Sequence, residues 1–307
     1  MPKPTPDRVF LFKESIMNAA AYDRLLWKSG KKPPDHPETR LISTQNAELR
    51  VRDTGGAGAV VAFFCDPPVT VEAYDALLEQ FRKHYRVLVI ELPGFGFSRP
   101  RGGSGYEFGR SVEAMEEVLQ DVDTDGMILC GPCICGFVAT ELANRQHLPV
   151  KGLVLMQTPD MAGMLEWRKR MDPKGLLRTP FVGQSLVRAT ANRLSRFWLK
   201  YATARSFDPT DLVHTTVGAQ KKGAAFPLAT MLQRWRKGPV DGALDLPTLA
   251  IWGLQDRSHR NTGPECTLKH APEAQIVSFQ QCGHFTELEQ PEAFSEVARP
   301  FISECLG

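Results

Sequence analysis

The sequence predicts an α/β fold with a mostly parallel central sheet, helices on both faces of the sheet and an inserted helical cap. Short apolar runs such as AVVAFFC (59–65) and RVLVIEL (86–92) recur along the chain, and helical patterns separate most of them. Apolar runs of this length are typical of strands buried on both faces, and their alternation with helices favours parallel pairing. The stretch between VLMQTPD (154–160) and PTLAIWG (247–253) has helical patterns but no clear strand, which predicts the cap.

The individual elements follow from how apolar residues are spaced. TRLISTQ and AELRVRDT alternate apolar and polar residues, which favours an antiparallel hairpin at an edge of the sheet. The other predicted strands are AVVAFFC (59–65), RVLVIEL (86–92), GMILC (126–130), VKGLVLM (150–156), PTLAIWG (247–253) and AQIVSF (274–279). Helical spacing is found in VEAYDALLEQFRKH, SVEAMEEVLQDV, GFVATELANRQ and PEAFSEVARPFISECL.

These elements divide the chain into three parts. Residues 1–37 form a predicted helical extension, because RVFLFKESIMNAAAYDRLLW has helical spacing and KSGKKPPDHP is polar and bounded by proline. The α/β core takes residues 38–160 and 241–307, and the helical cap takes residues 161–240. We therefore expect the cap to be inserted into the core and not to follow it as a separate domain.

The composition favours a globular protein of the cytoplasm. Of the 307 residues, 42% are hydrophobic and 23% are charged, which is ordinary for a globular chain. No apolar run reaches the roughly 20 residues that a membrane span needs. The N-terminus lacks the apolar stretch of about 7–15 residues of a secretory signal. Seven cysteines, an odd number, favour free thiols in a reducing compartment, so we expect a cytoplasmic location.

Charge is distributed unevenly along the chain. Residues 161–240 hold 15 Lys and Arg against 4 Asp and Glu, a net charge of 15 − 4 = +11, whereas the remainder holds 22 against 31, a net charge of 22 − 31 = −9. Two interpretations stay open, a solvated basic face or a surface that attracts an anionic substrate. No groove-reading motif accompanies the charge, so a nucleic-acid partner is not expected.

A motif that can carry chemistry follows the strand GMILC. GPCICG (131–136) stands between this strand and a helix, and the pattern glycine-x-nucleophile-x-glycine places a reactive side chain on a strained turn in that context. Gly131 takes the first glycine position and Cys133 takes the nucleophile position. Cys135 replaces the second glycine and is followed by Gly136. Cysteine is small enough for the close approach of backbone that this turn requires.

Four motifs in order resemble the α/β-hydrolase superfamily, over residues 38–307. RVLVIELPGFGFSRP resembles the family's strand followed by P-G-x-G-x-S, and GPCICG resembles its nucleophile elbow, with cysteine in place of the usual serine. PTLAIWGLQDR resembles the strand that ends at the catalytic acid, and CGHFTELEQPEAF resembles the loop that carries the catalytic histidine. The resemblance implies an α/β-hydrolase fold and a triad of Cys133, Asp256 and His284. Cysteine nucleophiles have a precedent among enzymes similar to dienelactone hydrolase.

The triad assigns a role to each side chain. A free cysteine is mostly protonated at pH 7, but a helix N-terminus and a histidine base should both lower the pKa of Cys133. Asp256 would hold the imidazole of His284 in the useful tautomer. The structural alternatives are a buried apolar cysteine in a degenerate elbow, an acidic turn residue and a loop histidine.

The oxyanion loop departs most from the family pattern. FFCDPP places Phe64 and Cys65 where the family usually has His-Gly, and Asp66 at the donor position. The backbone N–H groups of Asp66 and Ile134 are the predicted oxyanion donors. An ionised Asp66 carboxylate would oppose the oxyanion. Either it points away and begins the turn at Pro67, or it is protonated or acts on the substrate as an acid or base.

Metal, redox and cofactor chemistry are not expected. Cys130, Cys133 and Cys135 have no second pair of ligands nearby in the sequence, and Cys130 should point away from Cys133 because it lies on the strand. Cys65 and Cys282 could approach the same pocket, which would make a thiol cluster. The segment PGFGFS lacks the lysine of a phosphate-binding loop.

The reaction predicted is cofactor-free hydrolysis of, or acyl transfer from, an ester, thioester or lactone through a thioester intermediate. The partner would be a small-molecule acyl substrate, and the basic cap suggests coenzyme A or an acyl-carrier protein. The alternative is a catalytically degenerate protein of the same fold that binds a small ligand. Candidate pocket residues are Phe64, Cys65, Asp160 and Trp167. Phe197, Trp198, Phe226 and Trp235 are further candidates, with helix packing as the alternative, and the oligomeric state is left open.

Overall fold

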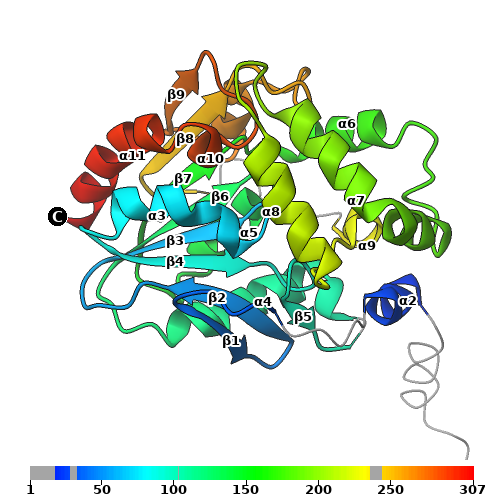
Figure 1. Cartoon of the computed structure of the whole chain (residues 1–307). Coiled ribbons are helices and arrows are strands. Elements are labelled where there is room, and N and C mark those ends of the chain that lie inside the picture. The colour runs from blue at the N-terminus through cyan, green and yellow to red at the C-terminus, as the bar shows by residue number, and fades with distance from the viewer. Residues whose placement is uncertain (1–17, 28–32, 103, 236–243) are drawn as a thin grey trace, which may run out of the picture.

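The computed structural model of the chain describes residues 18–27, 33–102, 104–235 and 244–307 (Figure 1). Its centre is one sheet with the strand order β1-β2-β4-β3-β6-β7-β8-β9, and a short strand, β5, pairs with β2 off this path. The strands are β1 (Thr39–Ser43), β2 (Ala47–Asp53), β3 (Val60–Cys65), β4 (Arg86–Glu91), β5 (Arg99–Pro100), β6 (Met127–Pro132), β7 (Val150–Met156), β8 (Thr248–Gly253) and β9 (Gln275–Phe279).

The predicted mixture of parallel and antiparallel pairing is confirmed. Strands β1 and β2 form the antiparallel hairpin at one edge, and β2 pairs antiparallel with β4. From β4 to β9 every neighbouring pair is parallel. Strands β3, β6 and β8 are buried along their whole length, because helices cover both of their faces. Strand β5 has only two residues and is not among the predicted strands.

Helices cover the sheet in two layers. In Figure 1, α3 and α11 lie together in front of the sheet and α4 and α5 lie behind it, and both pairs are in contact. The helices of the core are α3 (Asp75–Phe81), α4 (Phe108–Gln120), α5 (Ile134–Arg145), α10 (Thr286–Glu289) and α11 (Pro291–Leu306), with 3-10 turns at Val71–Tyr74, Ser104–Tyr106 and Pro264–Lys269.

Four helices occupy the chain between β7 and β8, where the sequence predicts the inserted cap. They are α6 (Met161–Met171), α7 (Val182–Ala202), α8 (Thr210–Lys221) and α9 (Leu228–Arg234), and α7 contacts both α8 and α9. In Figure 1 they lie beside the carboxyl ends of the parallel strands. Residues 236–240 of the predicted cap lie outside the described residues, and the division into core and cap stays a prediction.

The described part of the predicted N-terminal extension contacts the helices between β7 and β8. Helix α2 (Ala19–Leu26) packs against α7 and α9, and the phenol of Tyr22 hydrogen-bonds to Ser185 at 3.0 Å. The guanidinium of Arg188 lies over the ring of Trp27 at 4.8 Å. The predicted helical segment begins at residue 8, and its residues 8–17 lie outside the described part. Among the described residues, no helix has both the length and the apolar character needed to cross a membrane.

Candidate active site

The carboxyl edge of the parallel strands brings the predicted reactive residues together. Asp66 follows β3, Cys133 follows β6 and Asp256 lies in the turn after β8. Because these strands are parallel and lie in one sheet, their carboxyl ends open on the same edge. His284 comes from the loop between β9 and α10 and is completely buried.

Cys133 occupies a strained turn between β6 and α5. Its φ of 46° and ψ of −119° lie in a region of backbone conformation that residues other than glycine rarely adopt. The backbone N–H of Cys133 donates to the carbonyl of Met156 at 2.7 Å. The side chain is only 4% exposed. The turn ends directly at Ile134, the first residue of α5, so the sulfur lies at the helix N-terminus.

The glycines of the elbow are required by close packing. A Cβ at Gly131 would lie 2.7 Å from Cα of Gly136, and a Cβ at Gly136 would lie 2.2 Å from Oγ1 of Thr158. Cys135, at the position of the family's second glycine, directs its thiol away from this contact and donates to the carbonyl of Cys65 at 3.3 Å. The substitution of cysteine for glycine therefore leaves the turn intact.

His284 and Asp256 form the expected histidine–carboxylate pair. Nδ1 of His284 lies 2.6 Å from Oδ2 of Asp256. The carboxylate is fixed by two further donors, the amide of Gln157 at 2.8 Å and the backbone N–H of Ser258 at 2.7 Å. Although burial opposes ionisation, the His284 imidazolium holds the pKa of Asp256 well below its usual range. The sequence analysis did not single out Gln157, which follows β7 and also accepts from the N–H of Gly253.

Asp66 does not point away from the site. Its Oδ2 lies 2.8 Å from Nε2 of His284, so the imidazole stands between two carboxylates. Burial disfavours the imidazolium, but Asp256, through its charge and its hydrogen bond, raises the pKa of His284 well above its usual value, and the hydrogen bond from Asp66 adds to this. Burial raises the pKa of Asp66, although its bond to His284 acts in the opposite direction. The His284 imidazole predicted to serve the thiol therefore also hydrogen-bonds to Asp66.

A second histidine lies against the thiol. Nε2 of His259 is 3.8 Å from Sγ of Cys133. The hydroxyl of Thr262 donates to the carbonyl of His259 at 3.2 Å, and so it accepts from Nδ1–H of His259 at 2.8 Å. This tautomer turns the lone pair of Nε2 toward the sulfur. Sequence reasoning missed His259, although its place three residues after Asp256, on the same strand-end loop, was a usable signal.

The pKa of the thiol departs from the prediction. Burial raises the pKa of Cys133 to about 11, and the neighbouring Asp66 carboxylate acts in the same direction, against a smaller opposing effect of His284. The expected lowering of this pKa is therefore wrong, because burial and the Asp66 carboxylate outweigh the effect of His284. Burial also lowers the pKa of His259 to about 4, so this imidazole is neutral at pH 7.

The sequence of most of this chain is similar to that of a known protein family. Residues 55–291 match the family model described as the alpha/beta hydrolase fold. The chain belongs to the α/β-hydrolase family. The predicted α/β-hydrolase fold is thereby confirmed, with its mostly parallel sheet and flanking helices.

Curated relatives and solved structures that are similar to this α/β-hydrolase cover most of its length. A pimeloyl-[acyl-carrier protein] methyl ester esterase of Nitrosomonas europaea is 27% identical over 72% of this chain and 86% of its own length. A 2-hydroxy-6-oxononadienedioate/2-hydroxy-6-oxononatrienedioate hydrolase of Cupriavidus pinatubonensis is 26% identical over 71% of this chain and 76% of its own length. A thermophilic esterase from Thermogutta terrifontis superposes with a TM-score of 0.66 at 20% identity, over 88% of this chain and 99% of its own.

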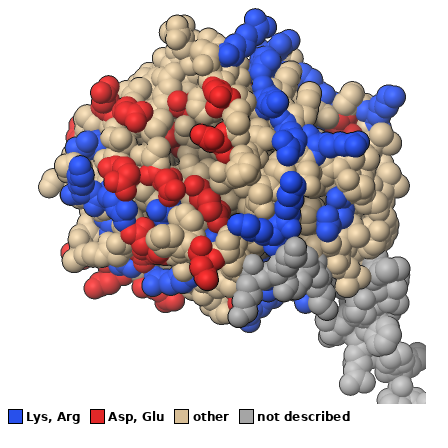
Figure 2. Space-filling model, viewed as in Figure 1, with Lys and Arg blue, Asp and Glu red and all other residues tan. Residues whose placement is uncertain are grey.

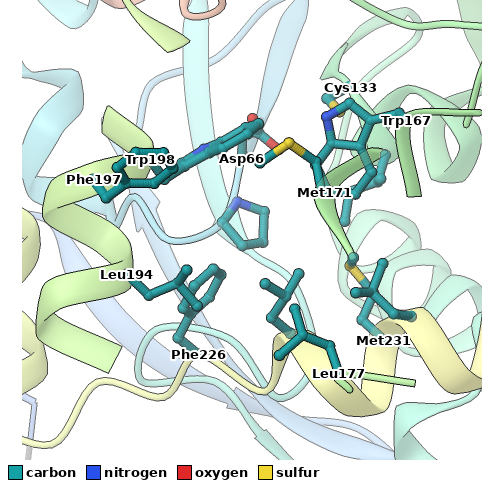
Figure 3. Close-up of a pocket in the computed structure, with 14 residues that line it drawn as sticks. Asp66, Cys133, Trp167, Met171, Leu177, Leu194, Phe197, Trp198, Phe226 and Met231 are labelled. Carbon is teal, nitrogen blue, oxygen red and sulfur yellow. The ribbon is translucent and has the colours of Figure 1, made fainter. Parts of the chain in front are cut away.

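An apolar pocket leads to the thiol of this α/β-hydrolase. Figure 3 shows Asp66 and Cys133 at one end of it, with apolar and aromatic side chains around the remaining space. Its walls come largely from the cap helices and include Trp167, Met171, Leu177, Leu194, Phe197, Trp198, Phe226, Leu228, Met231 and Leu232, with Pro67 and Ile134 from the core. Phe197 is 57% exposed, so the pocket reaches the molecular surface.

Three of the predicted pocket residues lie elsewhere. Phe64 is a fully buried residue of the fully buried strand β3, and Cys65 is buried at the end of that strand. Asp160 begins α6, where its carboxylate accepts from the N–H of Gly163 at 2.7 Å and pairs with Lys269. Of the four predicted pocket residues only Trp167 lines the pocket, and Trp235 is held instead by its hydrogen bond to the carbonyl of Tyr106.

The two predicted oxyanion donors border the same pocket. Asp66 and Ile134 both line it beside Cys133. Ile134 is the first residue of α5, where an N–H has no partner within its helix. Pro67 follows Asp66 and has no N–H, so at this point of the loop only the N–H of Asp66 can donate. The oxyanion role of the two groups stays a prediction.

Proposed function

We propose that this hydrolase cleaves an ester, thioester or lactone through an acyl-thioester on Cys133. The observation that carries the proposal is the position of the Cys133 sulfur. It lies on a strained turn at a helix N-terminus, 3.8 Å from an imidazole lone pair and at the end of an apolar pocket. A nucleophile, a neighbouring base and a third group that orients the base are the elements of covalent acyl transfer.

In this proposal two histidines divide the proton transfers. His259 accepts the thiol proton at Nε2 as the sulfur attacks the acyl carbon, so no free thiolate has to form before the attack. The oxyanion is bound by the N–H groups of Ile134 and Asp66. His284 carries a proton at Nε2, held by Asp66, and gives it to the departing alkoxide or thiolate. The C–O or C–S bond to the leaving group breaks, and the acyl group remains on Cys133 as a thioester.

Hydrolysis of the thioester reverses these roles. His284 has become neutral, and Asp256 still holds its Nδ1–H. It takes a proton from water, whose oxygen attacks the thioester carbon. The thiolate leaves as the C–S bond breaks and recovers its proton from His259. Both histidines then have the protonation with which they started, so the cycle is balanced.

Intact-mass spectrometry with p-nitrophenyl hexanoate tests this proposal. We expect one hexanoyl adduct on the wild-type protein and none on Cys133→Ala, with Cys266→Ala as the matched control because Cys266 is a free, partly exposed cysteine. The p-nitrophenolate ion leaves without a proton, so His284→Gln should still acylate and should accumulate the adduct. His259→Gln should slow acylation by about 10²-fold or more, the range of general-base catalysis.

Two outcomes would count against covalent catalysis. One is an adduct of equal amount on Cys133→Ala, and the other is the absence of any adduct on both the wild type and His284→Gln. Either result would favour the degenerate protein that binds a ligand without turnover. Asp66, which occupies Nε2 of His284, would then be a residue that blocks catalysis.

We further propose that the acyl group arrives on an anionic carrier, either coenzyme A or an acyl-carrier protein. Figure 2 shows Lys and Arg gathered over the part of the surface where α7 and α8 lie, and Asp and Glu gathered on the other side. On α7, Arg193, Arg196 and Lys200 are exposed and flank Phe197 at helical spacing. Phe197 lines the pocket, so positive charge borders its mouth. The curated relative that acts on a pimeloyl-[acyl-carrier protein] ester supports this class of substrate.

A further inference from the structure

The thiol and the two imidazoles at the end of the pocket also have the arrangement of a metal site. Sγ of Cys133 and one ring nitrogen each of His259 and His284 all lie within 4.8 Å of one another. Oδ2 of Asp66 lies 2.8 Å from Nε2 of His284 but does not belong to this group of mutually close atoms. Thiolate, imidazole and carboxylate are the ligands that Zn²⁺ takes in proteins. We propose that Cys133, His259 and His284 bind one Zn²⁺ ion, with the fourth position open to water, and that the ion closes the thiol to reaction.

The distance between the thiol and His259 agrees with tetrahedral coordination. With Zn–S near 2.3 Å and Zn–N near 2.0–2.1 Å, a sulfur and a nitrogen on one tetrahedral ion lie about 3.6 Å apart. Sγ of Cys133 and Nε2 of His259 are 3.8 Å apart. The metal would replace the proton between Nε2 of His284 and Oδ2 of Asp66, so this hydrogen bond has to break when the ion binds.

Both histidines are already oriented for metal binding. A metal-bound imidazole usually donates its other N–H to a carboxylate or another oxygen, which fixes the ring and its tautomer. Nδ1 of His284 lies 2.6 Å from Asp256, and Nδ1 of His259 lies 2.8 Å from the hydroxyl of Thr262. Each ring thus has an outer partner on one nitrogen and directs Nε2 into the site. Two fixed imidazoles distinguish this cluster from a chance gathering of polar groups.

The consequence of the bound ion is inhibition. Sγ of Cys133 and Nε2 of His259 and of His284 are the atoms that the proposed reaction uses, and the metal would occupy all three. Asp66 and Cys133 line the pocket, so the ion has a route to the site from the surface. Metal binding does not require that Cys133 be a nucleophile, and a spectroscopic test of the ligands is independent of any acyl adduct.

Cobalt spectroscopy on the full-length protein, purified without a histidine tag, tests the site. Titration with Co²⁺ should give one equivalent of tetrahedral ligand-field absorption and a thiolate-to-cobalt charge-transfer band, and Zn²⁺ should displace both. Cys133→Ser should lose the charge-transfer band. His259→Gln and His284→Gln should each weaken binding by at least about tenfold, and Thr262→Val should weaken it by about tenfold through loss of the outer partner. Zn²⁺ should also protect Cys133 from iodoacetamide, and EDTA should reverse the protection.

Matched controls separate this site from adventitious binding. Cys266→Ser and His214→Gln replace a partly exposed cysteine and an exposed histidine that are not in the cluster, and both variants should bind Co²⁺ like the wild type. An octahedral cobalt spectrum, or a charge-transfer band that persists in Cys133→Ser, would overturn the proposal. So would unchanged affinity in both site-histidine variants, with circular dichroism confirming that each variant is folded.

Discussion

Asp66 adds to the effect of burial in disfavouring ionisation of the Cys133 thiol. It is 3% exposed, its carboxylate raises the pKa of Cys133, and it holds Nε2 of His284 at 2.8 Å. One side chain therefore disfavours the thiolate and also competes with the thiol for the His284 imidazolium. A substrate carbonyl that displaces this carboxylate would remove both effects together, and burial would remain as the main cause of the raised thiol pKa.

Replacement of Asp66 by asparagine should make the thiol more acidic. The substitution removes a like charge next to the thiolate and frees the His284 imidazolium to pair with the sulfur. We expect the apparent pKa of Cys133, about 11 in the wild type, to fall by about one unit or more. The measurement is the rate of iodoacetamide labelling of the Cys133 peptide as a function of pH.

Asp160→Asn is the matched control for this measurement. Asp160 is also a buried carboxylate near the carboxyl end of a strand, but it pairs with Lys269 and does not line the pocket. It should leave the labelling profile of Cys133 unchanged. An identical profile for Asp66→Asn and the wild type would refute the role assigned to Asp66.

At the level of elements, the site depends on how closely β6 and α5 approach β7. The strained turn at Cys133 persists because Gly131 and Gly136 let the backbones meet, while Thr158, just after β7, fills the space over Gly136. The hydroxyl of Thr158 also donates to the carbonyl of Gly131 at 3.1 Å. The position of the nucleophile is thus set by packing between elements and not by the turn alone.

Gly136→Ala should destabilise the protein and displace the elbow. Its Cβ would lie 2.2 Å from Oγ1 of Thr158, and forced overpacking of this kind costs about 1–3 kcal/mol. Gly218→Ala, in the middle of α8, is the matched control because a Cβ there meets no atom within 4 Å. It should be neutral or stabilising by up to about 1 kcal/mol. Urea unfolding of both variants checks the prediction, and equal stabilities would contradict it.

Local sequence patterns predicted the helices and strands well, because the burial of each segment is reflected in the spacing of its own apolar residues. The apolar runs that became β3, β4, β6, β7 and β8 are buried on both faces, and GPCICG has the spacing of the turn that it forms. His259, the orientation of Asp66 and the raised pKa of Cys133 all depend on contacts between distant segments. Asp66 meets His284 across 218 positions of the chain, and no local pattern reports such a contact. The same limit explains why Phe64 and Asp160 were placed in the pocket.

For the whole molecule, positive charge is concentrated on one part of the surface. The predicted cap segment carries +11 and the rest of the chain −9, and Lys and Arg gather over α7 and α8 (Figure 2). Oppositely charged partners approach such a surface faster, and the effect weakens as salt screens it. Because the basic stripe on α7 borders the mouth of the pocket, the field would bring an anionic carrier to the place where its acyl group can enter.

Reversal of charge on this stripe should impair carrier-bound substrates selectively. The double variant Arg193→Glu/Lys200→Glu changes the net charge by −4 beside Phe197. The matched control, Lys83→Glu/Lys151→Glu, makes the same change in charge at exposed positions outside the predicted cap. Lys151 lies at the amino-terminal end of β7. We expect the ratio of kcat/KM for an acyl-carrier substrate to kcat/KM for p-nitrophenyl hexanoate to fall by about tenfold or more in the first variant only. In that variant, kcat/KM for the acyl-carrier substrate should also depend less on salt concentration. Hexanoyl-coenzyme A and a hexanoyl acyl-carrier protein, assayed separately, identify the carrier by which ratio falls. Equal ratios in both variants for both carriers would show that the basic stripe serves solvation alone.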